Sequence, residues 1–131
     1  MPSIFSRIIQ GEIPSHKIAE DDQFFAFLDI NPLAKGHTLV VPKKETDYIF
    51  DINDRELADM MVFAKKVSHA IKKVIPCKKV GIAVIGLEVA HAHIHLVPLN
   101  NISDLNFDKP KLKLSQDELA AIAKAIRNEI R

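Results

Sequence analysis

Cysteine is nearly absent from this sequence of 131 residues, which contains a single one, Cys77. One cysteine excludes a disulfide within the chain, and it also excludes a Cys-x-x-Cys pair of metal ligands. We expect Cys77 to be an ordinary buried or half-buried thiol, because nothing in its surroundings marks it as a nucleophile.

A surplus of charge and a long hydrophobic run are also missing. The 18 basic and 17 acidic residues leave a net charge of +1, so the charge balance favours neither a nucleic acid nor an acidic membrane as partner. The first residues, "MPSIFSRIIQGEIP", are interrupted by Arg7 and Glu12 and do not resemble a signal peptide. No run is long enough to span a bilayer. We therefore expect a cytoplasmic protein.

What is present is typical of one globular domain over residues 1–131. Hydrophobic residues make up 47% and charged residues 27% of the chain, and there are no repeats or low-complexity linkers. Residues 4–11 predict a short helix that Gly11 closes and Pro14 stops. Strands are predicted over 16–21, 24–30, 37–42, 79–85 and 91–98.

Two further helices are predicted from their caps. Asn53 caps a long helix over 53–75, with Glu56 in the capping-box position, and Ser115 with Glu118 starts the last helix. Strands in hairpins, one long inserted helix and shorter terminal helices favour an α+β fold with a mainly antiparallel, five-stranded sheet.

Apolar residues beyond the needs of one small core predict a homodimer. The long helix carries an apolar stripe, and Met60 and Phe63 lie beside it as extra core or subunit contacts. The strand over 79–85 lacks polar alternation, which is typical of a strand covered on both faces. The predicted stripe consists of Leu57, Met61, Ala64, Val67, Ile71 and Val74.

Three histidines at alternate positions are the most unusual feature. In "HAHIHLVP", residues 91–98, the triad of His91, His93 and His95 alternates with apolar residues. Because alternate side chains of a strand share a face, the imidazoles form one row while Ala92 and Ile94 face the core.

Such a row suits phosphoryl or nucleotidyl transfer. A neutral imidazole can attack phosphorus, and a neighbouring imidazole can donate a proton or stabilise a phosphate oxygen. Two alternatives stay open. The row could be a solvated strand face, or His-x-His could bind zinc with a third ligand from elsewhere.

"HAHIHLVP" resembles the signature of the histidine-triad (HIT) family, His-φ-His-φ-His-φ-φ with φ apolar. "IFSRIIQGEIPSHKIAEDD" and "FLDINPLAKGHTLVVPKK" extend the resemblance, in order and spacing, over residues 3–99. The chain is most similar to the nucleoside phosphoramidase branch. The resemblance implies a HIT-like fold, a homodimer with one continuous sheet, and no cofactor. It also implies a purine nucleoside monophosphate derivative as substrate, such as a phosphoramidate, an acyl phosphate or a dinucleoside polyphosphate.

The resemblance also implies a role for each site residue. His93 would be the nucleophile that forms a covalent nucleotidyl intermediate, and His95 would contact the α-phosphate. His91 and His37 would support them. Asp29 would bind the ribose hydroxyls, with capping of the turn at Asn31-Pro32 as the alternative role. An apolar slot for the base would consist of Ile4, Phe5, Phe27, Ile30 and Leu39, residues that could equally belong to the ordinary core.

The chain departs from the family pattern just before the triad, where an asparagine often found a few residues earlier is also missing and "AVI" stands in its region. Family members commonly have Gly-Gln-Ser or Gly-Gln-Thr before the triad, where this chain has Gly86, Leu87 and Glu88. Leu87 cannot hydrogen-bond through its side chain, and an ionised Glu88 in the nucleotide site would repel phosphate. A nucleotide-binding or interaction module with little catalytic activity is therefore the alternative to an enzyme.

The second departure concerns metal. Zinc-binding members use Cys-x-x-Cys near the N-terminus and a histidine after "PK". The matching positions here are Ser3, Ser6 and Glu45, so we expect no metal.

Overall fold

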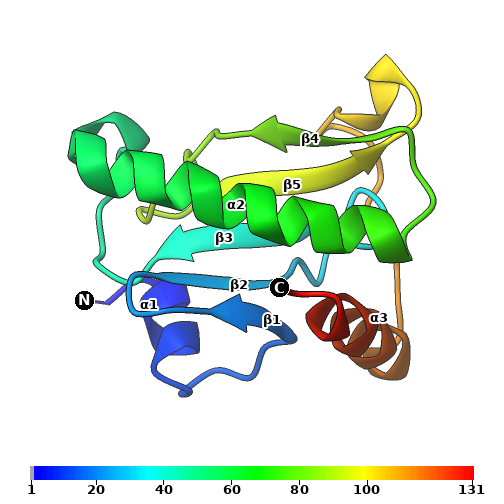
Figure 1. Cartoon of the computed structure of the whole chain (residues 1–131), viewed down its shortest axis with the longest axis horizontal. Helices are drawn as coiled ribbons and strands as arrows, with labels where there is room; N and C mark the ends of the chain where they lie inside the picture. The colour runs from blue at the N-terminus through cyan, green and yellow to red at the C-terminus, as the bar shows by residue number, and fades with distance from the viewer. Residues whose placement is uncertain (1) are drawn as a thin grey trace.

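Five strands form one antiparallel sheet in the computed structural model, which describes residues 2–131 (Figure 1). The strand order is β1-β2-β3-β5-β4. The predicted α+β class and five-stranded antiparallel sheet are thereby confirmed. The strands are β1 (Lys17–Glu20), β2 (Phe24–Leu28), β3 (Thr38–Pro42), β4 (Lys79–Ala83) and β5 (Ile94–Leu99).

Each of the three α-helices begins directly after a residue whose side chain caps it. The Asn53 side chain accepts a hydrogen bond from the Glu56 backbone N–H at 2.8 Å, and Ser115 and Glu118 form the predicted capping box. Among the described residues, no helix has both the length and the apolar character needed to cross a membrane. The helices are α1 (Ile4–Ile9), α2 (Asp54–Val74) and α3 (Gln116–Asn128), with short 3-10 helices η1 (Ile49–Asp51) and η2 (Ile102–Asp104).

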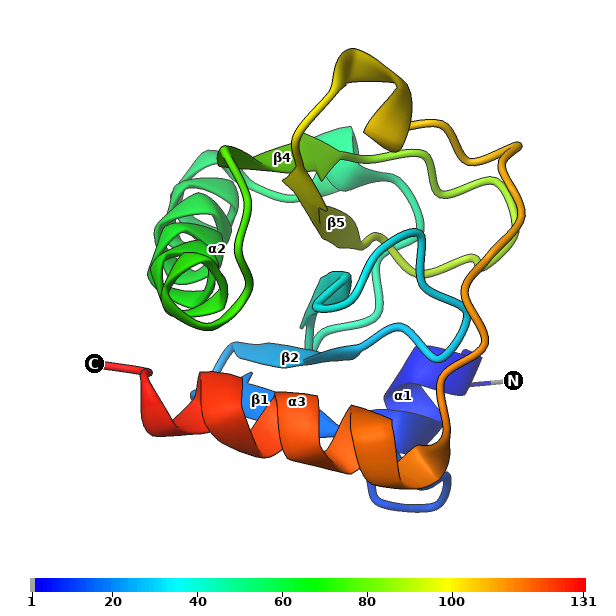
Figure 2. The ribbon, with the colours of Figure 1, turned by 90° about the vertical axis from the view of Figure 1, so that its right-hand side faces the viewer.

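The alternation of side chains gives the sheet two different faces. In β2, Phe24, Ala26 and Leu28 belong to the main core with α2 and α3. Phe25 and Phe27 point the other way into a second apolar cluster that includes residues of α1. Figure 2 shows α2 and α1 on opposite sides of the sheet.

The apolar stripe of α2 is the predicted one except at one position, where Met60 is buried in place of Met61. Met60 is 0% exposed and Phe63 is 6% exposed, so both belong to the core of this chain rather than to its outer surface. Met61, placed in the stripe by the sequence, is 43% exposed. Ala64, Val67 and Ile71 of the predicted stripe are buried together with Met60, at spacings of three and four residues, and Leu57 and Val74 are partly buried against them.

One edge of the sheet is covered by a helix and the other is not. The β1 edge is covered by α3, and Arg127 donates a hydrogen bond to the Lys17 carbonyl at 2.7 Å. β4 pairs only with β5, and Ile82 is 47% exposed. The expectation that residues 79–85 are covered on both faces is therefore wrong within the single chain, because no side chain of β4 is fully buried and Val84 and Ile85, which follow the strand, are exposed.

The histidine strand starts later than predicted. β5 begins at Ile94, so His95 lies in the strand while His91 and His93 precede it. The backbone before Ile94 is held outside the ladder, since the Ala92 N–H donates to the Thr46 carbonyl at 2.7 Å. Ala92, Ile94 and Leu96 are still buried in the main core, as the alternation predicts.

Candidate active site

The ring of His93 is held in one tautomer by the backbone. Its Nδ1 lies 2.9 Å from the His91 carbonyl oxygen. A carbonyl only accepts, so Nδ1 carries the proton and, in the neutral ring, Nε2 has the free lone pair. His93 is 7% exposed, and its ring lies 4.8 Å from that of His95, centroid to centroid. The arrangement leaves a basic nitrogen within reach of a bound molecule.

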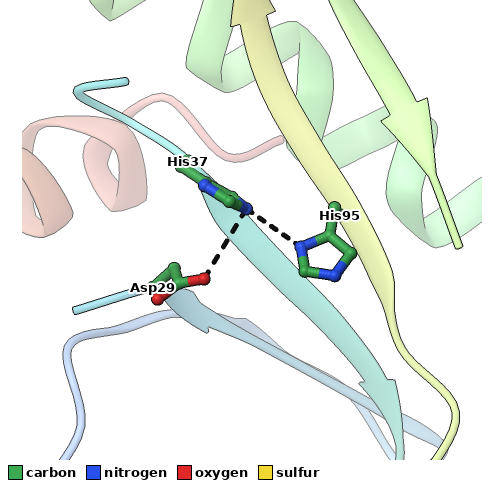
Figure 3. A group of neighbouring side chains, drawn as sticks. All are labelled: Asp29, His37 and His95. Atoms are coloured by element: carbon green, nitrogen blue, oxygen red, sulfur yellow. Dashed lines mark hydrogen bonds and ion pairs between the residues drawn. The ribbon is translucent and has the colours of Figure 1, made fainter. Parts of the chain in front are cut away.

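A second chain of hydrogen bonds sets the tautomers of His37 and His95 (Figure 3). The Leu33 backbone N–H donates to His37 Nδ1 at 3.0 Å, so that nitrogen is unprotonated and Nε2 carries the hydrogen. His37 Nε2 then donates to His95 Nδ1, 3.0 Å away. The proton of a neutral His95 is consequently on Nε2, where it can be donated to a ligand.

Burial keeps both of these histidines neutral. Loss of solvent lowers the pKa of His37 to about 4, with further lowering by the charges of Lys111 and His93. Loss of solvent, followed by the charges of His93 and His37, lowers the pKa of His95 to about 3. At neutral pH, His37 and His95 are therefore uncharged, and His95 offers an N–H donor rather than a cation.

Asp29 follows β2 and lies beside His37. One carboxylate oxygen accepts from the Asn31 backbone N–H at 2.8 Å, which is the turn-capping role considered as the alternative. The other lies 3.7 Å from His37 Nε2. Burial raises the pKa of the Asp29 carboxyl, while the Asn31 N–H opposes that shift. The side chain is 22% exposed, so one oxygen caps the turn and the other borders the site.

Within residues 2–131, one group of side chains is arranged as metal ligands would be: Asp29, His37 and His95 each have one ligand atom within 4.8 Å of the others. Zinc would need the lone pair of His37 Nε2, which would move the ring proton to Nδ1. There it would face the Leu33 N–H, donor against donor. The hydrogen bonds present therefore do not fit a metal ion at this position.

The predicted base slot is split between buried and exposed residues. Phe5, Phe27 and Leu39 are buried together in the second apolar cluster, and the Phe5 ring lies 4.9 Å from that of His93. Ile4 and Ile30 are 48% and 59% exposed. Three residues thus form an apolar wall beside His93, whereas the other two lie at the surface.

The two residues that depart from the family pattern lie on the outside of the molecule. Leu87 is 89% exposed, and Glu88 is exposed as well. Glu88 is near enough to Asp29 for its charge to raise the pKa of that carboxyl. Glu88 thus adds negative charge near the site instead of the neutral polar group that the family pattern has.

A segment that the sequence left unassigned covers the other side of the site. Residues 105–115, here called the strap, link η2 to α3 on the side of the sheet that carries α1 (Figure 2). The Phe107 ring lies 4.7 Å from the ring of His95 and 6.1 Å from that of His37. The sequence offered one aromatic residue as a signal, in a loop that also contains Leu105, Leu112 and Leu114.

The strap is fixed in place by backbone contacts. The Leu112 N–H donates to the Pro32 carbonyl at 2.8 Å, and the Lys111 ammonium bonds to the carbonyls of Phe107 and Lys109. The charge of Lys111 lowers the pKa of Asp29 and of His37. Lys111 therefore brings positive charge to the same region as Glu88 brings negative charge.

His91, the first residue of the triad, sits at the centre of a separate polar cluster. Ser3 Oγ lies 2.6 Å from His91 Nδ1, and Glu45 accepts from the Ser3 backbone N–H at 2.6 Å and from the Ser6 hydroxyl at 2.7 Å. These are the three positions that match the family's zinc ligands. Two hydroxyls do not form a zinc site, and all of these polar groups are already hydrogen-bonded to one another. A zinc ion does not fit there.

Comparison with known proteins agrees with the fold and the triad. A family model described as HIT domain matches residues 10–102. The chain is 34% identical to a protein named adenosine 5′-monophosphoramidase from Schizosaccharomyces pombe, over 100% of both chains. A Hit-like protein of Bartonella henselae, described as involved in cell-cycle regulation, superposes with a TM-score of 0.83 at 30% identity, over 97% of this chain and 95% of that one. A zinc-bound histidine triad family protein of Mycobacterium smegmatis gives 0.79 at 28% identity, over 97% and 91%. This chain belongs to the HIT family.

Proposed function

We propose that the protein is a nucleotide hydrolase or transferase that acts at the α-phosphorus of a nucleoside monophosphate derivative. The observation that carries the proposal is that two adjacent imidazole rings are held in opposite tautomers. His93 donates Nδ1–H to a carbonyl and keeps a lone pair on Nε2, while His95 accepts at Nδ1 and keeps a proton on Nε2. A nucleophile and a hydrogen-bond donor side by side suit attack on a phosphoryl group.

The reaction would proceed in two displacements. The Nε2 lone pair of His93 forms a bond to the α-phosphorus, and the bond to the leaving nitrogen or oxygen breaks with its electron pair, which takes a proton from water. The Nε2–H of His95 donates to a phosphate oxygen during this step. Water then attacks the phosphorus, the bond from nitrogen to phosphorus breaks, and the nucleoside monophosphate leaves with His93 neutral again.

The nucleoside part of the substrate would lie between the apolar wall and Asp29. Phe5, Phe27 and Leu39 would contact a purine base, and the free oxygen of Asp29 would accept from the ribose hydroxyls. Exposed Ile4 and Ile30 would border the mouth of the site. The name of the Schizosaccharomyces pombe relative supports an adenosine phosphoramidate as the first substrate to test.

A nucleotide-binding module with little turnover is the second candidate. It is favoured by one observation, the exposed Leu87 and the acidic Glu88 in place of the neutral polar residues of the family pattern. Glu88 near an anionic substrate disfavours binding and a charged transition state. The two candidates share a site and differ only in whether product is released repeatedly.

One experiment separates them. Protein at substoichiometric concentration is mixed with an adenosine phosphoramidate, and adenosine monophosphate is counted over time. Release of many equivalents supports the enzyme, and release of at most one favours the binding module. His93→Ala should abolish turnover and the acid-labile nucleotidyl adduct while leaving nucleotide affinity within about threefold. Unchanged turnover in this variant would refute the proposed nucleophile.

A metal-dependent hydrolase is a third reading that the same assay tests. Because the hydrogen bonds of His37 do not fit a metal ion, turnover should be indifferent to a chelator. Loss of activity with a chelator and its return with zinc would contradict the tautomers derived above.

We also propose a homodimer that continues the sheet across β4. β4 is the edge strand without a covering helix, and Met61, Val62 and Ile82 expose apolar side chains beside it. The same residues help to line a hollow of about 390 Å³ between α2 and β4. A second copy placed against β4 would pair its free edge and cover these side chains.

A further inference from the structure

We propose that Ser3, Ser6 and Glu45 form a hydrogen-bonded clamp that holds His91 and, through the His91 carbonyl, orients His93. The clamp joins residues from two distant segments, the start of α1 and the loop after β3. These are positioning residues, since none of them contacts His93 directly. As a statement about catalysis, the inference rests on the proposed function.

The Glu45 carboxylate is the fixed point of the clamp. One of its oxygens accepts from the Ser3 backbone N–H at 2.6 Å and from the Ser6 hydroxyl at 2.7 Å. The first of these donors, followed by the second, lowers the pKa of Glu45, so the group is ionised at neutral pH. The carboxylate therefore ties the first turn of α1 to the loop that follows β3.

The direction of each hydrogen bond around His91 follows from its backbone partner. The Pro42 carbonyl lies 2.7 Å from His91 Nε2, so Nε2 is the donor. Burial lowers the pKa of His91 and keeps the ring neutral, which makes Nδ1 an acceptor for the Ser3 hydroxyl at 2.6 Å. The ring is 0% exposed and is held on both sides.

The position of His91 is passed on through its main chain. The His91 carbonyl is the acceptor that selects the tautomer of His93, at 2.9 Å. The next peptide is fixed too, since the Ala92 N–H donates to the carbonyl of Thr46, the neighbour of Glu45. A shift of the His91 ring would therefore move the carbonyl on which the nucleophile depends.

The clamp connects the same positions that a metal connects elsewhere in the family. In this chain the three residues that match the zinc ligands are two serines and a glutamate, and they hydrogen-bond directly to one another and to His91. A zinc-bound relative exists in Mycobacterium smegmatis. We infer that in this protein the anchoring of α1 to the triad is achieved without metal.

The test compares three variants that disturb the clamp to different degrees. Glu45→Ala removes the acceptor, whereas Glu45→Gln keeps an oxygen in its place. Ser3→Gly removes the hydroxyl that donates to His91 but keeps the backbone N–H, and glycine caps a helix nearly as well as serine. Lys44→Ala is the control, because Lys44 is the exposed neighbour of Glu45 and its side chain is not one of the hydrogen-bonding groups described above.

Two readouts are measured, one of which needs no substrate. Nitrogen-15 NMR of the histidine rings should show His93 in the single Nδ1–H tautomer in the wild type, in Glu45→Gln and in Lys44→Ala. Glu45→Ala and Ser3→Gly should show a mixture of tautomers. In the same two variants kcat should fall about 10- to 100-fold, by analogy with the loss of groups that orient a metal-ligating histidine, with KM changed less than about threefold.

The outcomes separate this inference from the proposed function. Wild-type tautomers and kcat in Glu45→Ala, in a protein that melts cooperatively, would overturn the clamp. If Glu45→Ala and Ser3→Gly show a mixture of tautomers while the wild type has no turnover, the clamp is supported and the proposed enzymatic function is refuted. Restoration of Glu45→Ala by zinc would overturn the conclusion that the anchor is metal-free.

Discussion

The histidines of the site owe their roles to the backbone groups that each ring touches. The Leu33 N–H fixes His37, and the His91 carbonyl fixes His93. His95 is fixed in turn through His37. Residues of one chemical type thus become a lone-pair donor and a proton donor next to each other, with no need for a charged imidazolium in the resting site.

Acid should destabilise the protein through these buried rings. An unfolded histidine titrates near 6.5 and folded His37 at about 4, so between these pH values the unfolded chain binds a proton that the folded chain does not. The contribution of neutral His37 to the free energy of unfolding is fully present above pH 6.5. It is lost as the pH falls toward 4, and the loss amounts to about 3 kcal/mol. Urea unfolding at pH 7, 6, 5 and 4 measures this slope.

His37→Asn keeps an acceptor for the Leu33 N–H and removes the titrating group, so its slope should be smaller than that of the wild type. His69→Asn, at an exposed position of α2, is the control and should match the wild type. An identical slope in His37→Asn and the wild type would show that His37 is not the acid-sensitive group.

The strap residue Phe107 should help to set the pKa of His95. Its ring lies 4.7 Å from the His95 ring, and loss of solvent is the main cause of the lowered pKa. Phe107→Ala opens the site to water, so the pKa of His95 should rise from about 3 toward its ordinary value. Phe50→Ala, at a side chain 72% exposed, should leave it unchanged in an NMR titration. If the pKa of His95 is the same in both variants as in the wild type, the strap does not influence the electrostatics of the site.

At the scale of elements, the site depends on how closely β3 approaches the end of α2. Gly36 precedes His37 with a φ of +91°, and a Cβ there would lie 2.8 Å from Ile75 Cγ1. Glycine is therefore required both by its backbone angle and by the space available. The close approach lets β3 start at Thr38 with His37 directed at His95.

Substitution at Gly36 should consequently be costly. Gly36→Ala combines a left-handed backbone angle with a steric overlap and should lower the free energy of unfolding by about 2–4 kcal/mol. Gly11→Ala has a similar φ of +82° with no atom within 4 Å, and should cost only about 1 kcal/mol. If Gly36→Ala and Gly11→Ala lower the free energy of unfolding by the same amount in urea, the steric overlap with Ile75 is relieved at no cost.

Local signals in the sequence were sufficient to predict the elements and the triad. The alternation of histidines with Ala92, Ile94 and Leu96 placed the rings opposite the core, and the caps located α2 and α3. Periodicity alone could not distinguish Met60 from Met61 as the buried residue of α2, because neighbouring positions on a helix differ by less than the width of its apolar stripe.

Contacts between distant segments were out of reach of the sequence. Phe107 meets His95 only because the strap is pinned to Pro32, and no local pattern encodes that contact. The serines of α1 and Glu45 were noted only as absent metal ligands, although they gather around His91. Both require the tertiary fold.

For the whole molecule, the asymmetry between the two sheet edges predicts how copies associate. Wild-type protein should have twice the mass of one chain in light scattering at micromolar concentration, because pairing across β4 covers Ile82. Ile82→Lys should reduce the mass to that of one chain by placing a charge on the edge. Ile102→Lys, at a side chain 98% exposed in η2, should leave the mass unchanged. A wild-type protein with the mass of one chain would contradict the dimer.

The two ends of the chain emerge on opposite sides of the sheet (Figure 2). Ser3 is hydrogen-bonded to Glu45 and to His91. A purification tag or reporter fused just before Pro2 would therefore begin close in space to the triad. The other end, at Arg131, follows α3 on the side of the sheet that carries α2, opposite the side of α1. Affinity handles and surface tethers for kinetic work therefore belong at the carboxyl end.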